Sequence, residues 1–174
     1  LTLRQATGNG VDGHSSFTME DVLVEQCGTQ GVAAWGTGVV GRCTNVEVRQ
    51  CGWSGVLARN GASITLIGAK TTVHHNCTKG HSYQYGLQVY GSSSSTIQLV
   101  SPLTKEQVSL DNGGGGNWGA IGDGADIHQI KTITKSELEA AAAAAAARGE
   151  VRVPEDCKTL KAAVHWVHGV DRLT

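Results

Sequence analysis

Residues 21–32 read DVLVEQCGTQGV, and residues 45–56 read NVEVRQCGWSGV. When the first cysteine of each stretch is aligned, from position 27 to position 51, the offset is 24 residues. A period of about 20 to 50 residues is typical of solenoids and repeat arrays. The two stretches agree at further positions, which are Val22/Val46, Val24/Val48, Gln26/Gln50, Gly28/Gly52, Gly31/Gly55 and Val32/Val56.

Two more copies flank this pair. Upstream, residues 1–11 (LTLRQATGNGV) place Leu3 with Val24, Gln5 with Gln26, Ala6 with Cys27 and Gly10 with Gly31. Downstream, residues 72–77 (TVHHNC) begin another copy, with Val73 in the place of Val48. The repeat therefore extends well beyond the two stretches that define it.

Each copy carries short runs that alternate between apolar and polar residues, separated by glycine-rich breaks. This is the pattern of strands and turns, and no copy shows a helical stripe. Three strands of about five residues, at roughly 3.3 Å per residue, use up one repeat and return the chain over its start. We therefore expect a mainly β fold, a parallel β-helix with one coil per repeat. A β-sandwich and another type of solenoid are the alternatives, and the spaced leucines of leucine-rich repeats are missing.

The recurring pattern Val-x-x-Cys-Gly-x-x-Gly-Val, with Cys or Asn at the first corner, resembles right-handed parallel β-helix proteins of the pectate-lyase-like kind. The resemblance covers roughly residues 1–110 and implies a right-handed parallel β-helix. That fold hosts pectate lyases, polygalacturonases, mannuronan epimerases, phage tailspikes and non-enzymatic surface proteins. The resemblance thus implies a fold and leaves the function open.

The sequence predicts three segments. Residues 1–112 are expected to form β-helix coils, residues 113–133 a Gly-rich linker, and residues 134–174 a helical segment. A capping box at residues 134–137 (TKSE) precedes a predicted helix over residues 138–148, and a second helix is predicted over residues 159–168. This pair of C-terminal helices either caps the solenoid or forms the cap at the start of a second one. Because Leu1 already lies inside a repeat, we expect the chain to be part of a longer protein, and localisation stays open.

Charge and hydropathy narrow the choice of partner. The formal net charge is −1, with no strongly basic or acidic block in the repeats, which argues against nucleic acid. The longest strongly apolar run, residues 140–147, is too short to span a bilayer. We expect a polysaccharide or another protein as partner, or a place in a larger assembly.

Cysteine occurs five times, and Cys27 and Cys51 share one repeat position with Cys77 close by. Buried thiols, a disulfide framework and a metal site are the three alternatives, of which buried thiols are expected. The segment from His74 to Cys77, together with His81, has metal-ligand chemistry but no recognised zinc spacing, so we predict no metal and no cofactor. Residues 76–78 (NCT) also form a glycosylation sequon.

Outward positions of the first strand alternate in charge. Arg4, Glu25, Arg49 and His74 occupy one column, with Glu47 in the column beside it. Neighbouring strands are about 4.8 Å apart, so these side chains can form ion pairs from coil to coil. The alternative is that the same groups supply a catalytic base and charged side chains that hold a substrate.

The second strand predicts a column of planar side chains. Aligning Val11, Val32, Val56 and Leu87 places four residues at one outward position, which we name the ring column: His14, Trp35, Arg59 and Tyr90. Two interpretations are open. In one, the ring column is a ligand surface for sugar rings, extended by Trp53; in the other, it is a ladder in which Arg59 stacks between two aromatic rings.

Catalysis on this fold needs a dense charged cluster on one sheet, such as paired carboxylates or acidic calcium ligands with a nearby base. The repeats show none, and we name no catalytic residue. We therefore expect a non-catalytic or degenerate β-helix module that is structural or binds carbohydrate. One alternative is a polysaccharide-active lyase, epimerase or hydrolase whose catalytic cluster lies partly outside this sequence. The other is a purely structural repeat of a surface or filament assembly.

Overall fold

The computed structural model describes residues 1–147, and within them the strands form three parallel sheets of five strands. Sheet A contains β1 (Thr2–Arg4), β4 (Leu23–Glu25), β7 (Glu47–Arg49), β10 (Thr72–His74) and β13 (Ser109–Leu110). Sheet B contains β2 (Val11–Gly13), β5 (Val32–Trp35), β8 (Val56–Arg59), β11 (Leu87–Tyr90) and β14 (Trp118–Ile121). Sheet C contains β3 (Phe17–Glu20), β6 (Val40–Thr44), β9 (Ser63–Ile67), β12 (Thr96–Val100) and β15 (Ile130–Ile133).

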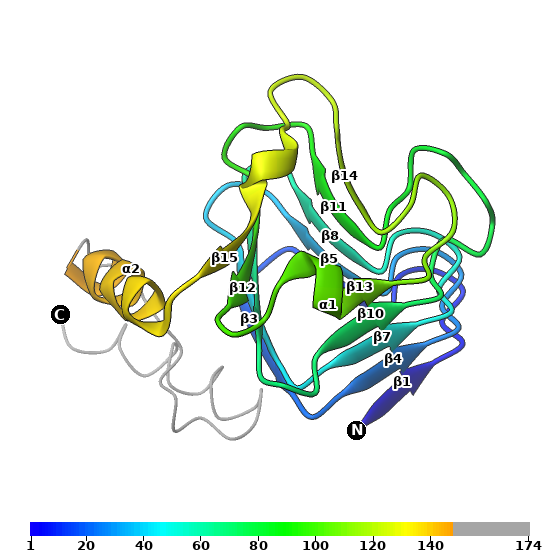
Figure 1. Ribbon diagram of the computed structural model, residues 1–174, viewed down its shortest axis with the longest axis horizontal. Coiled ribbons are helices and arrows are strands. Elements are labelled where there is room, and N and C mark those ends of the chain that lie inside the picture. The colour runs from blue at the N-terminus through cyan, green and yellow to red at the C-terminus, as the bar shows by residue number, and fades with distance from the viewer. Residues whose placement is uncertain (148–174) are drawn as a thin grey trace, which may run out of the picture. The chain divides into compact units, whose positions relative to one another are not determined.

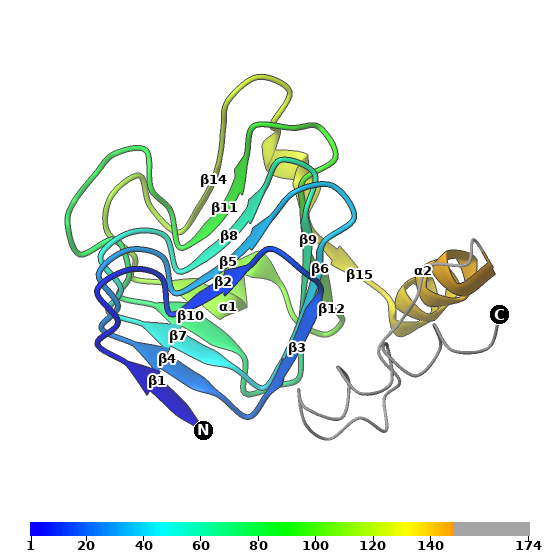
Figure 2. The same cartoon turned by 180° about the vertical axis from the view of Figure 1, so that it is seen from behind.

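The chain runs through sheets A, B and C in turn and then rises by one strand, so that every coil pairs with the coil before it. Figures 1 and 2 show the sheets as the walls of one solenoid. The repeat sets the register: Val24 pairs with Val48, and Val48 with Val73. The predicted parallel β-helix is confirmed.

Alternation along each strand sends one set of side chains into the solenoid. Val24, Val48 and Val73 of sheet A are fully buried, as are Val32 and Val56 of sheet B. Burying an aliphatic side chain of this size contributes about 1.5–3 kcal/mol relative to exposure. Stacked columns of small aliphatic residues therefore supply the core.

The corner between sheets A and B is built the same way in every coil. One register position carries Ala6, Cys27, Cys51, Asn76 and Asn112 in successive coils. The residue before it always has a positive φ, from 51° at Asp111 to 57° at Gln5. This left-handed residue turns the chain sharply, so the following side chain enters the interior. The Cys and Asn positions that recur in the sequence are therefore equivalent.

The segment predicted as a Gly-rich linker, residues 113–133, contributes strands β14 and β15 and the short 3₁₀ helix η1 (Ile127–Gln129) to a fifth coil. The coils thus continue past residue 112. Gly114 shows why glycine is needed there. Its φ is 62°, and a Cβ at this position would lie 2.6 Å from the carbonyl oxygen of His81. The glycines permit close backbone packing. In the sequence alone, the same run of glycines has the composition of a flexible linker.

Two α-helices lie in the described residues. Helix α1 (Lys105–Val108), which was not predicted, connects sheet C to sheet A and lies across the interior at the last coil (Figure 1). Its Val108 is buried. Helix α2 (Lys135–Ala147) starts directly after Thr134, as the capping box requires, and belongs to a separate unit. The predicted second helix, residues 159–168, lies outside the described residues. No helix within residues 1–147 is long and apolar enough to cross a membrane.

Candidate binding surface on sheet B

The structure brings the ring column together. Trp35 pairs with Arg59, and Arg59 with Tyr90, in the parallel register of sheet B. His14 follows Gly13, which pairs with Ala34, so it holds the same position one coil earlier. The four side chains thus lie on successive coils, as the repeat predicts.

The members of the ring column stack on one another. The His14 and Trp35 rings are nearly parallel, with centroids 5.9 Å apart and planes 10° apart. The guanidinium carbon of Arg59 lies 5.0 Å from the Trp35 ring centroid and 4.3 Å from the Tyr90 ring centroid. These are cation–π distances, so Arg59 is held between two aromatic rings.

This stacking decides what the ring column offers to a ligand. The two faces of Trp35 lie against His14 and Arg59, so they are not open to a flat sugar ring. Ring edges and polar groups remain, including the hydroxyl of Tyr90, to which no residue within 1–147 forms a hydrogen bond. At the centre of the ring column a ligand would therefore meet ring edges and polar groups, because the ring planes of Trp35 are covered.

Asp12 is a polar neighbour that the sequence analysis did not connect to the ring column. Its Oδ1 accepts hydrogen bonds from Trp35 Nε1 at 2.5 Å and from Asn9 Nδ2 at 2.9 Å. Its Oδ2 lies 3.8 Å from His14 Nε2. Asp12 therefore orients the first two rings. Strand alternation could have predicted this contact, because Asp12 and His14 are two residues apart and therefore lie on one face of the sheet.

Trp53, predicted to extend the ring column, has different ring neighbours. Its ring meets His81 edge-on at 6.3 Å, and Lys79 Nζ lies 5.9 Å from its centroid. His81 in turn stacks on Tyr83 at 5.3 Å. Trp53 thus belongs to a second aromatic group, formed with the loop of residues 78–86.

The loop of residues 78–86 is tied to the scaffold by a buried polar group. Ser54 Oγ donates to Gln84 Oε1 at 2.6 Å and also contacts the side chain of Gln88, and all three residues are buried. The backbone N–H of Gly115, in the next coil, donates to Gln84 O at 2.8 Å. In Figures 1 and 2 this loop projects beside sheet B, next to the segment that leads into β14.

On sheet A the charged column forms one connected set of ion pairs. Glu25 accepts hydrogen bonds from both Arg49, at 2.7 and 2.9 Å, and Arg4. Glu47 contacts Arg49 at 3.0 Å and His74 at 3.1 Å. Hydrogen bonds from Arg49, and then from Arg4, hold the pKa of Glu25 below its usual value although burial acts in the opposite direction. These groups are engaged with one another, which favours the structural interpretation of the column.

The four cysteines of residues 1–147 are free and buried, as expected. Burial raises the pKa of Cys43, Cys51 and Cys77 to about 12. Cys157 lies outside the described residues.

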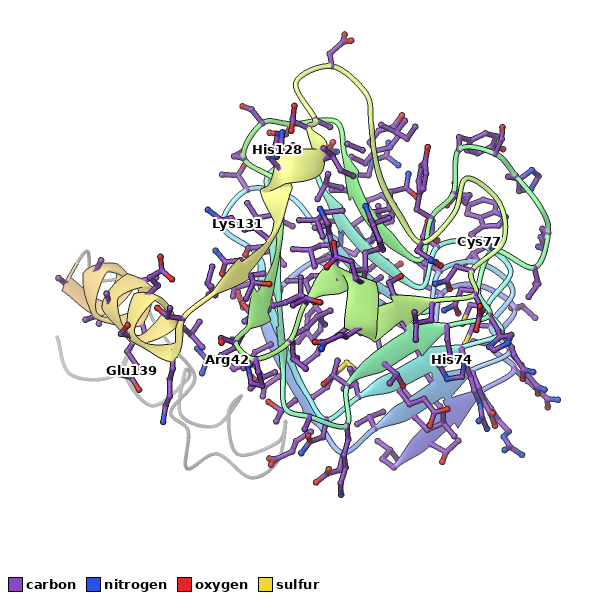
Figure 3. The ribbon with its side chains drawn as sticks, viewed as in Figure 1. Arg42, His74, Cys77, His128, Lys131 and Glu139 are labelled. Atoms are coloured by element: carbon purple, nitrogen blue, oxygen red, sulfur yellow. The ribbon has the colours of Figure 1, made fainter. Side chains whose placement is uncertain are left out.

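His74 lies on sheet A with Cys77 beyond its end (Figure 3), and Nδ1 of His74 is 2.8 Å from Nδ1 of His75. Within residues 1–147 no group of three or more His, Cys, Asp or Glu side chains is placed to hold a metal ion. Asn76, the acceptor of the sequon, is 1% exposed and hydrogen-bonded inside the corner, so it cannot carry a glycan in this fold.

Comparisons with protein-family models, with curated proteins and with solved structures find no match to this chain. The functional interpretation therefore rests on the geometry of the solenoid and its side chains.

Proposed function

We propose that this β-helix is a non-catalytic module that binds carbohydrate along the ring column of sheet B. The observation that supports the proposal is the continuous stack of His14, Trp35, Arg59 and Tyr90 on successive coils. Parallel strands are about 4.8 Å apart, so three coils span roughly 10 Å, close to the length of a disaccharide. The ring column is thus long enough to follow a sugar chain.

The proposed contacts are polar. The edge of the ring column presents the Tyr90 hydroxyl, the Arg59 guanidinium and the His14 imidazole, and these groups suit the hydroxyl and acidic groups of a sugar. The strands hold them in a fixed spacing, which lowers the entropy lost on binding. The similarity of the repeat to pectate-lyase-like β-helices supports the choice of carbohydrate, since that fold hosts several polysaccharide enzymes.

A non-catalytic role is favoured by the state of the charged residues. On sheet A, Glu25 and Glu47 are bonded to Arg49, and Glu25 is 3% exposed. Asp12, beside the ring column, is occupied by Trp35 and Asn9. A carboxylate pair free to act as general acid and base would favour the enzymatic alternative.

The test combines a glycan array with calorimetry. The unmodified protein should retain at least one glycan from a set of neutral and acidic polysaccharides. Tyr90→Phe removes a hydroxyl that no described residue uses, so it should weaken binding by roughly two- to tenfold and leave the Tm unchanged. Tyr83→Phe makes the same change on the loop of residues 78–86 and should leave the affinity unchanged. Retention of no glycan would contradict the proposal and favour a purely structural repeat.

A further inference from the structure

Arg59 differs from the other arginines of the sheet A and sheet B strands in what it contacts. Arg4 and Arg49, on sheet A, are both paired with Glu25. Arg59 has an aromatic ring on either side and forms no ion pair with any residue of 1–147. Its Nε is buried without a hydrogen-bond partner. A guanidinium has five N–H donors, so this one retains unused donor capacity.

Asp12, the carboxylate that contacts the ring column, does not fill this capacity. Asp12 is bonded to Trp35 Nε1 and Asn9 Nδ2, and its other close neighbour is His14. No hydrogen bond joins Asp12 to Arg59. The guanidinium is thus held by stacking, and no carboxylate within residues 1–147 pairs with it.

The stack also orients the guanidinium. Because Trp35 and Tyr90 occupy its two faces, only its edge with the terminal N–H groups is left for a ligand. A guanidinium edge is a planar fork that matches the two oxygens of a carboxylate or of a sulfate. The rings fix the fork in advance, so little side-chain entropy is lost when an anion binds.

We propose that Arg59 selects an acidic glycan, by binding a sugar oxyanion at the edge of its guanidinium. This inference rests on the proposed carbohydrate binding and names its ligand class. The oxyanion is a uronate carboxylate or a sulfate ester, both of which present two oxygens to the fork. The Tyr90 hydroxyl, on the next coil, then lies beside the bound sugar as a hydrogen-bonding group for a hydroxyl.

The probes are 1,4-linked hexamers of glucuronate, galacturonate and mannuronate, each compared by calorimetry with its own neutral methyl ester. The acid should bind at least about tenfold more tightly than the ester, because a hydrogen bond to a charged group is the stronger kind. Its affinity should also fall as salt is added. A sulfated neutral hexamer separates the two sources: binding at the level of the uronates assigns the site to oxyanions in general, and weaker binding assigns it to carboxylates.

Variants then test whether Arg59 causes the preference for the acid over its ester. Arg59→Gln should remove the difference between acid and ester, and Arg59→Lys should restore only part of it, since lysine is a point charge without the planar fork. Lys131→Gln, at an exposed position of β15 in sheet C (Figure 3), removes the same charge and should leave the difference intact.

Equal affinity of acid and ester in the unmodified protein would overturn the inference while leaving carbohydrate binding in place. Binding of no probe and of no array glycan would overturn both. The acid–ester comparison uses the unmodified protein, so it decides the inference even if Arg59→Gln does not fold.

Discussion

The backbone N–H of Cys51 donates a hydrogen bond to the side-chain oxygen of Asn76, at 3.1 Å, although both residues hold the same position on neighbouring coils. Asn76 Nδ2 meanwhile donates to the carbonyl oxygen of Val48 at 3.0 Å. One buried amide therefore satisfies both a donor and an acceptor of the coil before it. A cysteine at this position fills space, whereas an asparagine also joins two coils.

Asn76→Ala should consequently lower the free energy of unfolding by about 2 kcal/mol or more. The change leaves the buried N–H of Cys51 without a partner, and such a group costs about 1–3 kcal/mol. Urea denaturation measures the loss. Cys51→Ala, at the equivalent position, removes packing but no amide and should cost less. An equal cost for the two variants would contradict the proposed role of the asparagine.

Val48→Asp should prevent stable folding. Val48 is fully buried between Val24 and Val73, so a carboxylate there would lie among apolar side chains and away from solvent. An unpaired buried charge costs several kcal/mol. Circular dichroism during a thermal melt measures the effect. Val40→Asp makes the same change at a position that is 45% exposed and should melt close to the unmodified protein. Similar melts for the two variants would argue against the assigned core.

The buried thiols should be unreactive until the chain unfolds. A thiol reacts as the thiolate, and the pKa of about 12 for Cys43, Cys51 and Cys77 keeps these three protonated at pH 8. In a Cys157→Ser background, Ellman's reagent should modify these three slowly in the native protein. In denaturant without reductant it should titrate all four remaining cysteines. A denatured count of two would indicate a disulfide.

How far the sequence predicts this molecule depends on what each pattern encodes. A 24-residue offset fixes which residues share a coil position, so the alignment of Trp35 with Arg59 follows from the repeat. Alternation then assigns each side chain to the interior or the exterior. The same rule overestimates exposure where a long side chain or a loop covers an outward position. Gln88 points outward on sheet B and is nevertheless 2% exposed, because the loop of residues 78–86 bonds to it.

The repeat pattern of the sequence predicts neither the fifth coil nor the stacking geometry of the ring column. In β13, Ser109 replaces the aliphatic residue of earlier coils, and glycines occupy the following turn, so little of the repeat's residue pattern remains there. Stacking in the ring column depends on side-chain rotamers, which a repeat does not specify. The sequence therefore predicts that the rings lie in one column but cannot tell whether their faces or their edges are open.

The ion pairs of sheet A should make stability depend on pH through Glu25. Its pKa is lowered from 4.5 in the folded state, chiefly by hydrogen bonds from Arg49 and then from Arg4. A carboxyl group with a depressed folded pKa contributes stability that is fully present above its unfolded pKa. That contribution is lost as the pH falls through the folded value. Glu25→Gln should therefore unfold at lower urea concentration than the unmodified protein at pH 7, and this gap in urea midpoint should narrow steadily below about pH 4.5.

Asp123→Asn changes an exposed carboxylate on a loop and serves as the matched control, which should change stability little at pH 7 or at pH 3. A gap for Glu25→Gln that stays constant from pH 7 to pH 3 would show that packing of the side chain, and not its charge, stabilises this corner of sheet A.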